Sequence, residues 1–133
     1  MKILSIDPGP TSSGFVYSEG LSIIDFGKEK NKIIRQKGFN PLLVLIESPD
    51  YLVKNAGLSM ISTAIEIGRF IELYEPKCFV EQIGRKEVLS YFKLKNDKSV
   101  RDYLIKKYDV SLTKDSWQAY LLTVYKQTRF NLQ

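Results

Sequence analysis

The sequence predicts one α/β domain over residues 1–133, with a five-stranded mixed sheet in which an antiparallel three-strand meander leads into parallel strands flanked by helices. Two short β-prone runs, 14–17 and 21–26, follow the first strand closely, as in a meander. Residues 42–46 are apolar at every position, which is typical of a strand covered on both faces in a parallel sheet. The amphipathic segment 58–74 separates this strand from the next and predicts a crossover helix.

The N-terminal elements are delimited by proline and glycine. The first strand, Lys2–Asp7, ends at Pro8-Gly9-Pro10, because proline removes a backbone donor and glycine permits a tight turn. Ser18-Glu19-Gly20 separates the next two runs and predicts a hairpin. The polar stretch 28–40 has room for a helix.

The segment Leu58–Tyr74 is the clearest helix in the sequence, and Pro76 ends it. Its main apolar stripe is broad and consists of Leu58, Ile61, Ala64, Ile65, Gly68, Ile71 and Leu73. Further apolar residues widen it beyond the need of a one-sided surface helix: Met60, Ile67, Phe70 and Tyr74. This width is compatible with a helix buried inside the monomer and with a helix that faces a second subunit; in the second case Ile67 and Phe70 are the candidate interface residues.

The rest of the sequence predicts one more strand and three helices. The strand covers Cys78–Ile83, and the helices cover Arg85–Leu94, Ser99–Tyr108 and Lys114–Phe130. In the last helix, the residues that fall on one side are Ala119, Leu122 and Tyr125 or Lys126.

The residue types exclude several kinds of site. The chain has no histidine, which excludes histidine triads, His-ligated zinc and imidazole catalysis. The single cysteine, Cys78, excludes an intramolecular disulfide and a zinc site built from several thiolates. No apolar run approaches the roughly 20 residues that cross a bilayer, and the N-terminus lacks a signal-peptide layout. We therefore expect a cytoplasmic protein.

The positive charge is confined to the C-terminal part of the chain. Residues 1–83 hold 9 Lys and Arg against 10 Asp and Glu, whereas residues 84–133 hold 11 against 5. A surface that binds a polyanion has this composition, and so does a solvated lysine-rich surface.

Three acidic residues stand at positions where α/β folds bind ligands. Asp7 and Glu47 each end an apolar strand, and Asp115 begins the last predicted helix. If the two strands are parallel neighbours, Asp7 and Glu47 lie roughly 5 Å apart at the backbone, and a hard divalent cation would offset their repulsion. Each acid also has an ordinary structural explanation, as a turn residue, a strand end or a helix-start residue. Together, in a basic chain without histidine, they favour a metal site.

Several short motifs resemble RuvC-type Holliday junction resolvases, a family with an RNase H-like fold. The segment Ile3-Leu4-Ser5-Ile6-Asp7-Pro8-Gly9 followed by Gly14-Phe15-Val16-Tyr17 resembles the opening of that family. The resemblance continues through Val44-Leu45-Ile46-Glu47, a helix with Gly68, and Asp97-Lys98-Ser99. It ends at Asp115-Ser116-Trp117-Gln118-Ala119, where the family typically has Asp-x-x-Asp-Ala. These motifs extend over essentially the whole chain.

The resemblance implies a metal-dependent endonuclease that resolves four-way DNA junctions by paired nicks, using two Mg²⁺ or Mn²⁺ ions. Asp7, Glu47 and Asp115 correspond to three of the family's four metal-binding acids. Gln118 stands at the fourth position, where an amide oxygen can bind a cation but supplies no charge. Glu81 is a possible replacement if it points into the same crevice.

The resemblance also implies branched DNA as the partner, a homodimer and, since the chain is short, a phage-encoded version of the enzyme. Lys98 corresponds to a basic position of the family and is the strongest candidate for a DNA contact. Further candidates are Arg85, Lys86, Lys93, Lys95 and Arg101. Tyr51 is a candidate for stacking on an unpaired base, with a half-buried loop tyrosine as the alternative.

Three other functions are compatible with parts of this pattern. A ribonuclease H-type enzyme would use the same fold on RNA/DNA hybrids, and a non-catalytic protein could bind branched DNA without cutting it. An actin-like kinase also opens with an Asp-x-Gly turn, but it needs a duplicated domain, which 133 residues do not provide.

Overall fold

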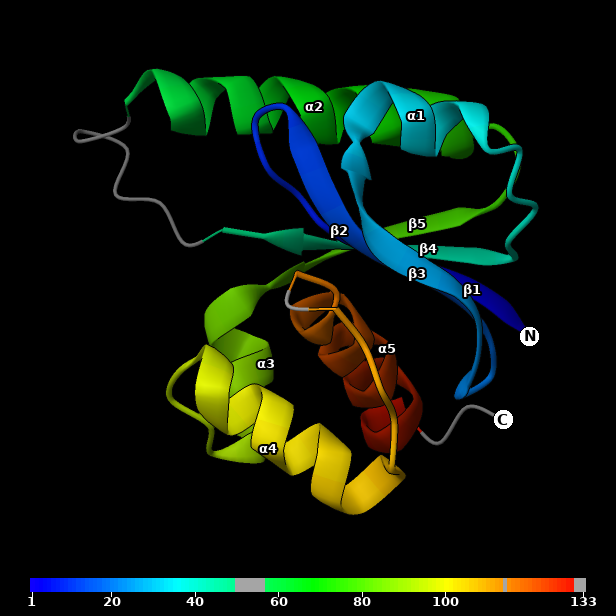
Figure 1. Ribbon diagram of the computed structural model, residues 1–133. Helices are drawn as coiled ribbons and strands as arrows, with labels where there is room; N and C mark the ends of the chain where they lie inside the picture. The colour runs from blue at the N-terminus through cyan, green and yellow to red at the C-terminus, as the bar shows by residue number, and fades with distance from the viewer. Residues whose placement is uncertain (50–56, 114, 131–133) are drawn as a thin grey trace.

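The computed structural model describes residues 1–49, 57–113 and 115–130, which form one five-stranded sheet between two layers of helices (Figure 1). The strands are β1 (Lys2–Asp7), β2 (Ser12–Glu19), β3 (Ser22–Lys30), β4 (Leu43–Ser48) and β5 (Phe79–Gly84). The helices are α1 (Asn31–Gln36), α2 (Leu58–Tyr74), α3 (Arg85–Phe92), α4 (Asp97–Tyr108) and α5 (Trp117–Phe130). Among the described residues, no helix is long and apolar enough to cross a membrane.

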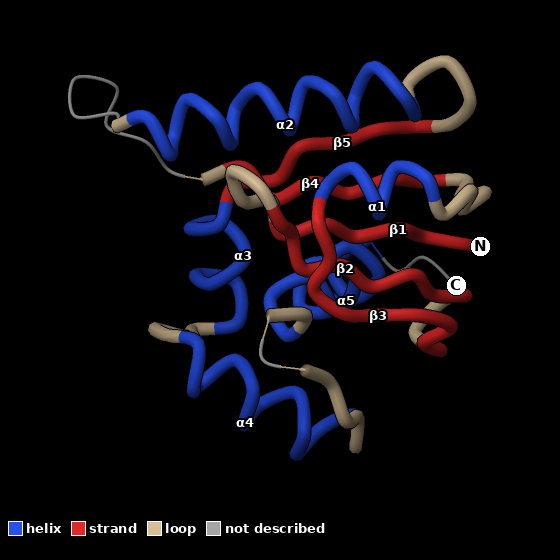
Figure 2. The backbone as a smooth tube through the Cα atoms, turned by 45° about the horizontal axis from the view of Figure 1, so that its top comes forward, coloured by secondary structure: helices blue, strands red, loops and turns tan. Residues whose placement is uncertain are grey.

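The sheet has the order β3-β2-β1-β4-β5, which Figure 2 shows as successive strands. β3, β2 and β1 are antiparallel, whereas β1, β4 and β5 are parallel. The predicted meander followed by parallel strands is therefore confirmed. β3 continues to Lys30, beyond the predicted end at Phe26, because an edge strand tolerates alternating exposed charges.

Two hydrophobic cores lie on opposite faces of the sheet, and the alternation of side chains along each strand sorts residues between them. Leu4 and Ile6 of β1 face α1 and α2, together with Val44 and Ile46 of β4. Ile3 of β1 and the β4 residues Leu43 and Leu45 face α5. The carboxyl-terminal residues Asp7 and Glu47 follow the second pattern, so both side chains are directed toward the α5 layer.

Helix α5 is central to the second layer. Its residues from Trp117 through Tyr125 are all buried, although the sequence predicted burial on one side only. The reason is that α5 packs on the sheet with one face, while Val88 of α3 and Val100 and Leu104 of α4 pack around its other faces.

Helix α2 has the predicted bounds, but the roles predicted for its faces are wrong. Ile67 and Phe70, which the sequence suggested as interface residues, are buried against the sheet at 7% and 0% exposure. The exposed apolar residues of α2 are instead Leu58, Ile61 and Ile65, at 83%, 51% and 52%. Periodicity alone shows that a helix has two apolar faces but does not show which face meets the sheet.

Candidate active site

The first two acids meet at the carboxyl ends of neighbouring parallel strands. Ile6 of β1 pairs with Ile46 of β4, so the next residues, Asp7 and Glu47, lie side by side. Each carboxyl group therefore influences the protonation of the other. The structure thus brings together the two residues that the sequence placed at adjacent strand ends.

The turn after Asp7 is fixed by buried polar side chains. The Gly9 backbone N–H donates to Ser13 Oγ at 3.1 Å, and Asn31 Nδ2 donates to the Gly9 carbonyl at 3.0 Å. Ser13 Oγ also donates to Asn31 Oδ1, and both side chains are 1% exposed. This network holds the turn in one conformation and so fixes the direction in which Asp7 leaves the sheet.

Asp115 lies in the turn before α5 and not in its first helical turn, which corrects the sequence prediction. The Ser116 carbonyl accepts the first helical hydrogen bond, from Tyr120 N–H at 3.0 Å. Ser116 N–H itself donates to the Thr113 carbonyl at 3.0 Å. A turn, not the helix dipole, therefore positions the Asp115 carboxylate, which also lies 3.8 Å from Lys28 Nζ of β3.

Gly14 of β2 allows the Asp115 main chain to approach the sheet. Gly14 pairs with Asp7 in the β1–β2 register and with Lys28 in the β2–β3 register. A Cβ atom at Gly14 would lie 1.7 Å from the Asp115 carbonyl oxygen, closer than any two such atoms can come. The absence of a side chain at this position therefore places Asp115 over the end of β1.

We expect Gly14→Ala to displace the Asp115 turn, to lower the free energy of unfolding by about 2–4 kcal/mol and to reduce the proposed nuclease activity. The measurements are urea unfolding and cleavage of a synthetic four-way junction. Gly57→Ala is the control, because a Cβ atom there meets no atom within 4 Å, and we expect at most about 1 kcal/mol of destabilisation. Equal effects of the two substitutions would contradict this role of Gly14.

Burial changes the protonation of the acid pair. Burial raises the pKa of Glu47 to about 9, and its hydrogen bond and repulsion with Asp7 add to this effect. Burial also raises the pKa of Asp7; the charges of Asp97 and Asp115 add to this rise, while Glu47 and Arg85 oppose it. Without a cation, the pair therefore retains a proton at neutral pH.

Gln118 of α5 joins this pair from the opposite layer. Its Nε2 donates to Glu47 Oε1 at 2.9 Å, and the residue is 6% exposed. Its other atom, Oε1, is buried and has no hydrogen-bond partner among the described residues. A buried carbonyl-type oxygen without a donor is a ready ligand for a hard cation.

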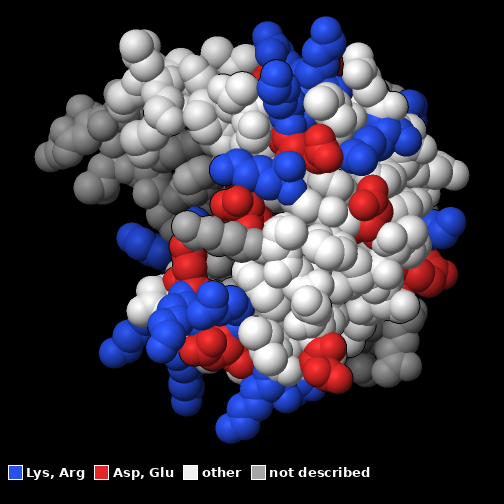
Figure 3. Space-filling view, viewed as in Figure 1, with Lys and Arg blue, Asp and Glu red and all other residues white. Residues whose placement is uncertain are grey.

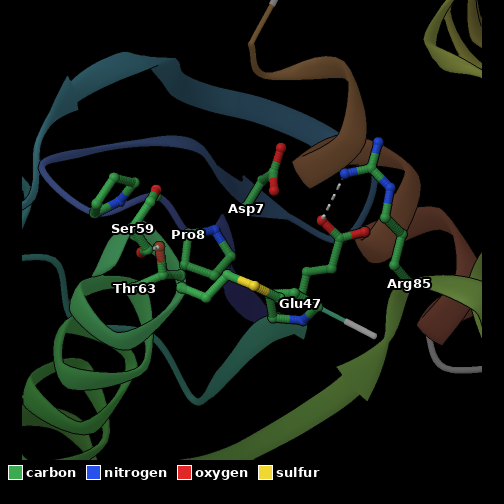
Figure 4. Close-up of a pocket in the computed structure, with 10 residues that line it drawn as sticks. Asp7, Pro8, Glu47, Ser59, Thr63 and Arg85 are labelled. Atoms are coloured by element: carbon green, nitrogen blue, oxygen red, sulfur yellow. Dashed lines mark hydrogen bonds and ion pairs between the residues drawn. The ribbon is translucent and has the colours of Figure 1, made fainter. Parts of the chain in front are cut away.

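Arg85, a predicted DNA contact, forms ion pairs within the site. It follows directly after β5, and its guanidinium lies 2.9 Å from Asp97 Oδ1. The same guanidinium lies 4.0 Å from Glu47 Oε2, as Figure 4 shows. A cavity of about 230 Å³ borders this arrangement, lined by Asp7, Glu47 and Arg85 and by Ser59, Met60 and Thr63 of α2. Arg85 thus supplies part of the positive charge that offsets the acids.

A second cavity, of about 90 Å³, connects the acids from both layers. Its walls include Asp7 from β1, Asp115 from the turn before α5, Gln118 from the first turn of α5, and Asp97 from the start of α4. Asp97 was not among the predicted site residues. Its presence in the Asp97-Lys98-Ser99 motif was the one available signal, but the distance between α4 and β1 is set by tertiary packing.

Two of the predicted DNA-binding residues lie beside these cavities. Lys98 and Arg101 of α4 line a groove of about 440 Å³ together with Asp97, Leu112 and Trp117. The other lysines, Lys86, Lys93 and Lys95, are exposed on α3 and in the turn after it, and they line none of these three cavities. Tyr51 lies outside the described residues.

Glu81 does not replace the missing acid. It points to the α5 side of β5, but it pairs with Leu45 in the register, two residues before Glu47. Its carboxylate lies 2.7 Å from Lys126 Nζ of α5. Glu81 therefore neutralises a lysine away from the acid pair.

The chemistry of these side chains suits a hard divalent cation, although the carboxylates do not cluster tightly. No three acids among the described residues are close enough to hold an ion as they stand. Arg85 lies between Glu47 and Asp97, and Lys28 lies against Asp115. Mg²⁺ and Mn²⁺ nevertheless prefer oxygen ligands of the kinds that line this cavity, namely carboxylates and an amide. The amide oxygen, Gln118 Oε1, is buried and has no hydrogen-bond partner among the described residues.

The sheet order and the two helix layers match the fold of RuvC, which is an RNase H-like architecture. The chain is similar to Thermus thermophilus RuvC in complex with a Holliday junction substrate, with a TM-score of 0.68, 15% identity, and coverage of 98% of this chain and 96% of that chain. A second structure of Thermus thermophilus RuvC gives a TM-score of 0.69 at 16% identity, covering 98% and 97%. The yeast mitochondrial Holliday junction resolvase Ydc2 gives 0.64 at 14% identity, covering 92% and 76%.

Comparisons of the sequence alone find no relative. No protein-family model and no curated protein matches this sequence.

Proposed function

We propose that this protein is a divalent-metal-dependent endonuclease that resolves four-way DNA junctions by paired nicks. The observation that carries this proposal is that Asp7, Glu47, Asp115 and Gln118 line two cavities at the carboxyl edge of the sheet, both of which include Asp7 and Arg85. The RuvC-type fold and the neighbouring structures of junction resolvases support the choice of substrate.

The four residues have complementary roles toward the metal. Bound there, Mg²⁺ or Mn²⁺ would activate the attacking water and stabilise the leaving oxygen of the phosphodiester. Asp7 and Glu47 would supply charged ligands from the sheet, and Asp115 and the free Oε1 of Gln118 would supply ligands from the α5 layer. Binding requires both strand-end acids to lose their shared proton, so metal affinity should rise with pH.

The basic surface beside the acids suits a DNA backbone. Residues 85–108 hold eight Lys and Arg against three Asp and Glu, and Figure 3 shows basic side chains gathered over α3 and α4. Lys98 and Arg101 are 78% and 50% exposed in side-chain area and border the groove that leads to Asp97. Phosphates bound along this groove would bring one strand to the acids.

The test is cleavage of synthetic substrates with Mg²⁺, Mn²⁺ or EDTA. We expect metal-dependent, symmetric nicks in a four-way junction and little cleavage of linear duplex. Preferential cutting of the RNA strand in a hybrid would instead favour a ribonuclease H-type enzyme. Tight junction binding with no cleavage in either metal would favour a non-catalytic branched-DNA-binding protein.

Paired nicks require two active sites, and we propose a homodimer formed through the exposed face of α2. Leu58, Ile61 and Ile65 form one apolar stripe on this face, and solvent exposure of such a stripe is unfavourable. The N-terminal turns of α2 also line the acid cavity through Ser59, Met60 and Thr63. Such a dimer would place the two active sites near its two-fold axis.

We expect Ile61→Glu and Ile65→Glu to produce folded monomers, because a buried charge disrupts an apolar interface. Sedimentation velocity at micromolar concentration measures this change. Ile105→Glu is the matched control, since Ile105 of α4 is similarly exposed at 44% and lies outside the stripe. Phe70→Glu should unfold the protein, because Phe70 is in the core. A monomeric wild-type protein would overturn the dimer.

A further inference from the structure

The carboxylate absent at position 118 has a possible replacement on another helix. Asp97 is the first residue of α4 and lines the same cavity as Asp7, Asp115 and Gln118. Its backbone position is well determined: Asn96 Oδ1 accepts from Ser99 N–H at 2.9 Å, and Ser99 Oγ accepts from Asn96 N–H at 3.1 Å. The α4 terminus thus presents a carboxylate to the cavity from a fixed main chain.

An independent feature of the cavity indicates that it receives a cation. Gln118 lines this cavity and is only 6% exposed, and its Oε1 atom is buried with no hydrogen-bond partner among the described residues. Leaving such an oxygen without a donor is unfavourable unless a ligand satisfies it. Among the described residues no donor reaches this oxygen, and the guanidinium of Arg85 pairs with Glu47 and Asp97 instead.

We propose that Asp97 supplies the fourth carboxylate of the metal site and compensates for the neutral Gln118. This inference rests on the proposed function, because it concerns the same site. Asp7, Glu47 and Asp115 carry three negative charges, whereas two divalent cations carry four positive charges. Asp97 would supply the fourth negative charge.

The present partner of Asp97 does not prevent this role. Arg85 Nη2 lies 2.9 Å from Asp97 Oδ1, but the Asp97 side chain is 84% exposed and ion pairs at such exposure are weak. A divalent cation in the cavity would repel the guanidinium and attract the carboxylate. Arg85 is therefore the cation that balances Glu47 and Asp97 until a metal replaces it.

Terbium binding without DNA tests this inference by a readout that does not depend on cleavage. Tb³⁺ is a hard cation that binds carboxylates, and the single tryptophan, Trp117, lines the same cavity and can sensitise its luminescence. We expect Asp97→Asn to raise the half-saturating Tb³⁺ concentration about 10-fold. Gln118→Asp should lower it, and the double variant Asp97→Asn/Gln118→Asp should return close to the wild-type value.

Two controls separate a direct ligand from an indirect effect. Asp102→Asn removes the same charge one turn further along α4, where Asp102 faces Lys98 and Arg101, and it should change Tb³⁺ binding less than about twofold. Asp97→Asn also frees the Arg85 guanidinium, which could itself repel the ion. In the Arg85→Gln variant this effect is absent, and Asp97→Asn should still weaken Tb³⁺ binding if Asp97 is a ligand.

The outcomes distinguish this inference from the proposed function. If Asp7→Asn weakens Tb³⁺ binding and Asp97→Asn does not, the metal site stands and the role of Asp97 is refuted. Failure of Gln118→Asp to rescue Asp97→Asn would likewise refute the compensation. If the wild-type protein gives no tryptophan-sensitised Tb³⁺ luminescence, the metal site and this inference both fail.

Discussion

Asp7→Asn is expected to reduce junction cleavage on the order of 1,000-fold or more while leaving junction binding intact or slightly tighter. Asp7 ends the central strand β1, lies beside Glu47 at the end of β4, and lines both cavities next to the acids. An amide in its place removes a charge from the centre of the proposed metal site. It also removes a negative charge that would repel the DNA phosphates, which is why binding should not suffer.

Cleavage kinetics and junction-binding titrations, measured on the same preparations, check this expectation. Glu47→Gln and Asp115→Asn should show the same separation of cleavage from binding. Asp25→Asn on β3 is the control, because Asp25 is an exposed acid paired with Lys37 and lies outside both cavities. Undiminished cleavage by any of the three site variants would remove that residue from the proposed metal site.

Glu47→Gln is expected to stabilise the metal-free protein, increasingly so as the pH rises from 5 to 9. Burial raises the pKa of Glu47 to about 9, whereas in the unfolded chain it is near the ordinary value of 4.5. The native state therefore holds a proton that the unfolded state has released. The contribution of Glu47 to stability is fully present below pH 4.5 and is lost as the pH rises toward 9.

The gain at pH 9 should be roughly 2–6 kcal/mol, since each pKa unit corresponds to about 1.4 kcal/mol. Urea unfolding in EDTA at pH 5, 7 and 9 measures it. Glu72→Gln, an exposed acid of α2, should show little change with pH. With added Mg²⁺ the wild-type protein should be more stable than Glu47→Gln, because only the wild-type site retains its full negative charge and binds the ion tightly. A stability difference that is constant between pH 5 and 9 would contradict a buried proton at Glu47.

Local sequence patterns determine the elements of this fold more closely than they determine its contacts. The all-apolar run in β4 and the proline-glycine turn after β1 predicted both strands and placed Asp7 and Glu47 at their ends. The bounds of α2 also follow from periodicity and from Pro76. These features depend on interactions between residues that are near in sequence.

Contacts between distant elements could not be derived in this way. The burial of Ile67 and Phe70 depends on which face of α2 meets the sheet, and the approach of Asp97 depends on how α4 packs against α5. The pairing of Arg85 with Glu47 depends on the parallel register of β4 and β5. Each of these depends on tertiary geometry, which a pattern along one segment does not contain.

The close contact between Gly14 and the Asp115 main chain has a consequence for how such a site can change over evolution. One missing side chain and a main-chain carbonyl place Asp115, while strand register places Asp7 and Glu47. Most surrounding side chains need only remain apolar, so substitutions can accumulate without moving the acids. A site positioned by main chain can therefore keep its shape while the surrounding sequence changes. The same property explains why comparisons of structure detect this fold where comparisons of sequence find no match.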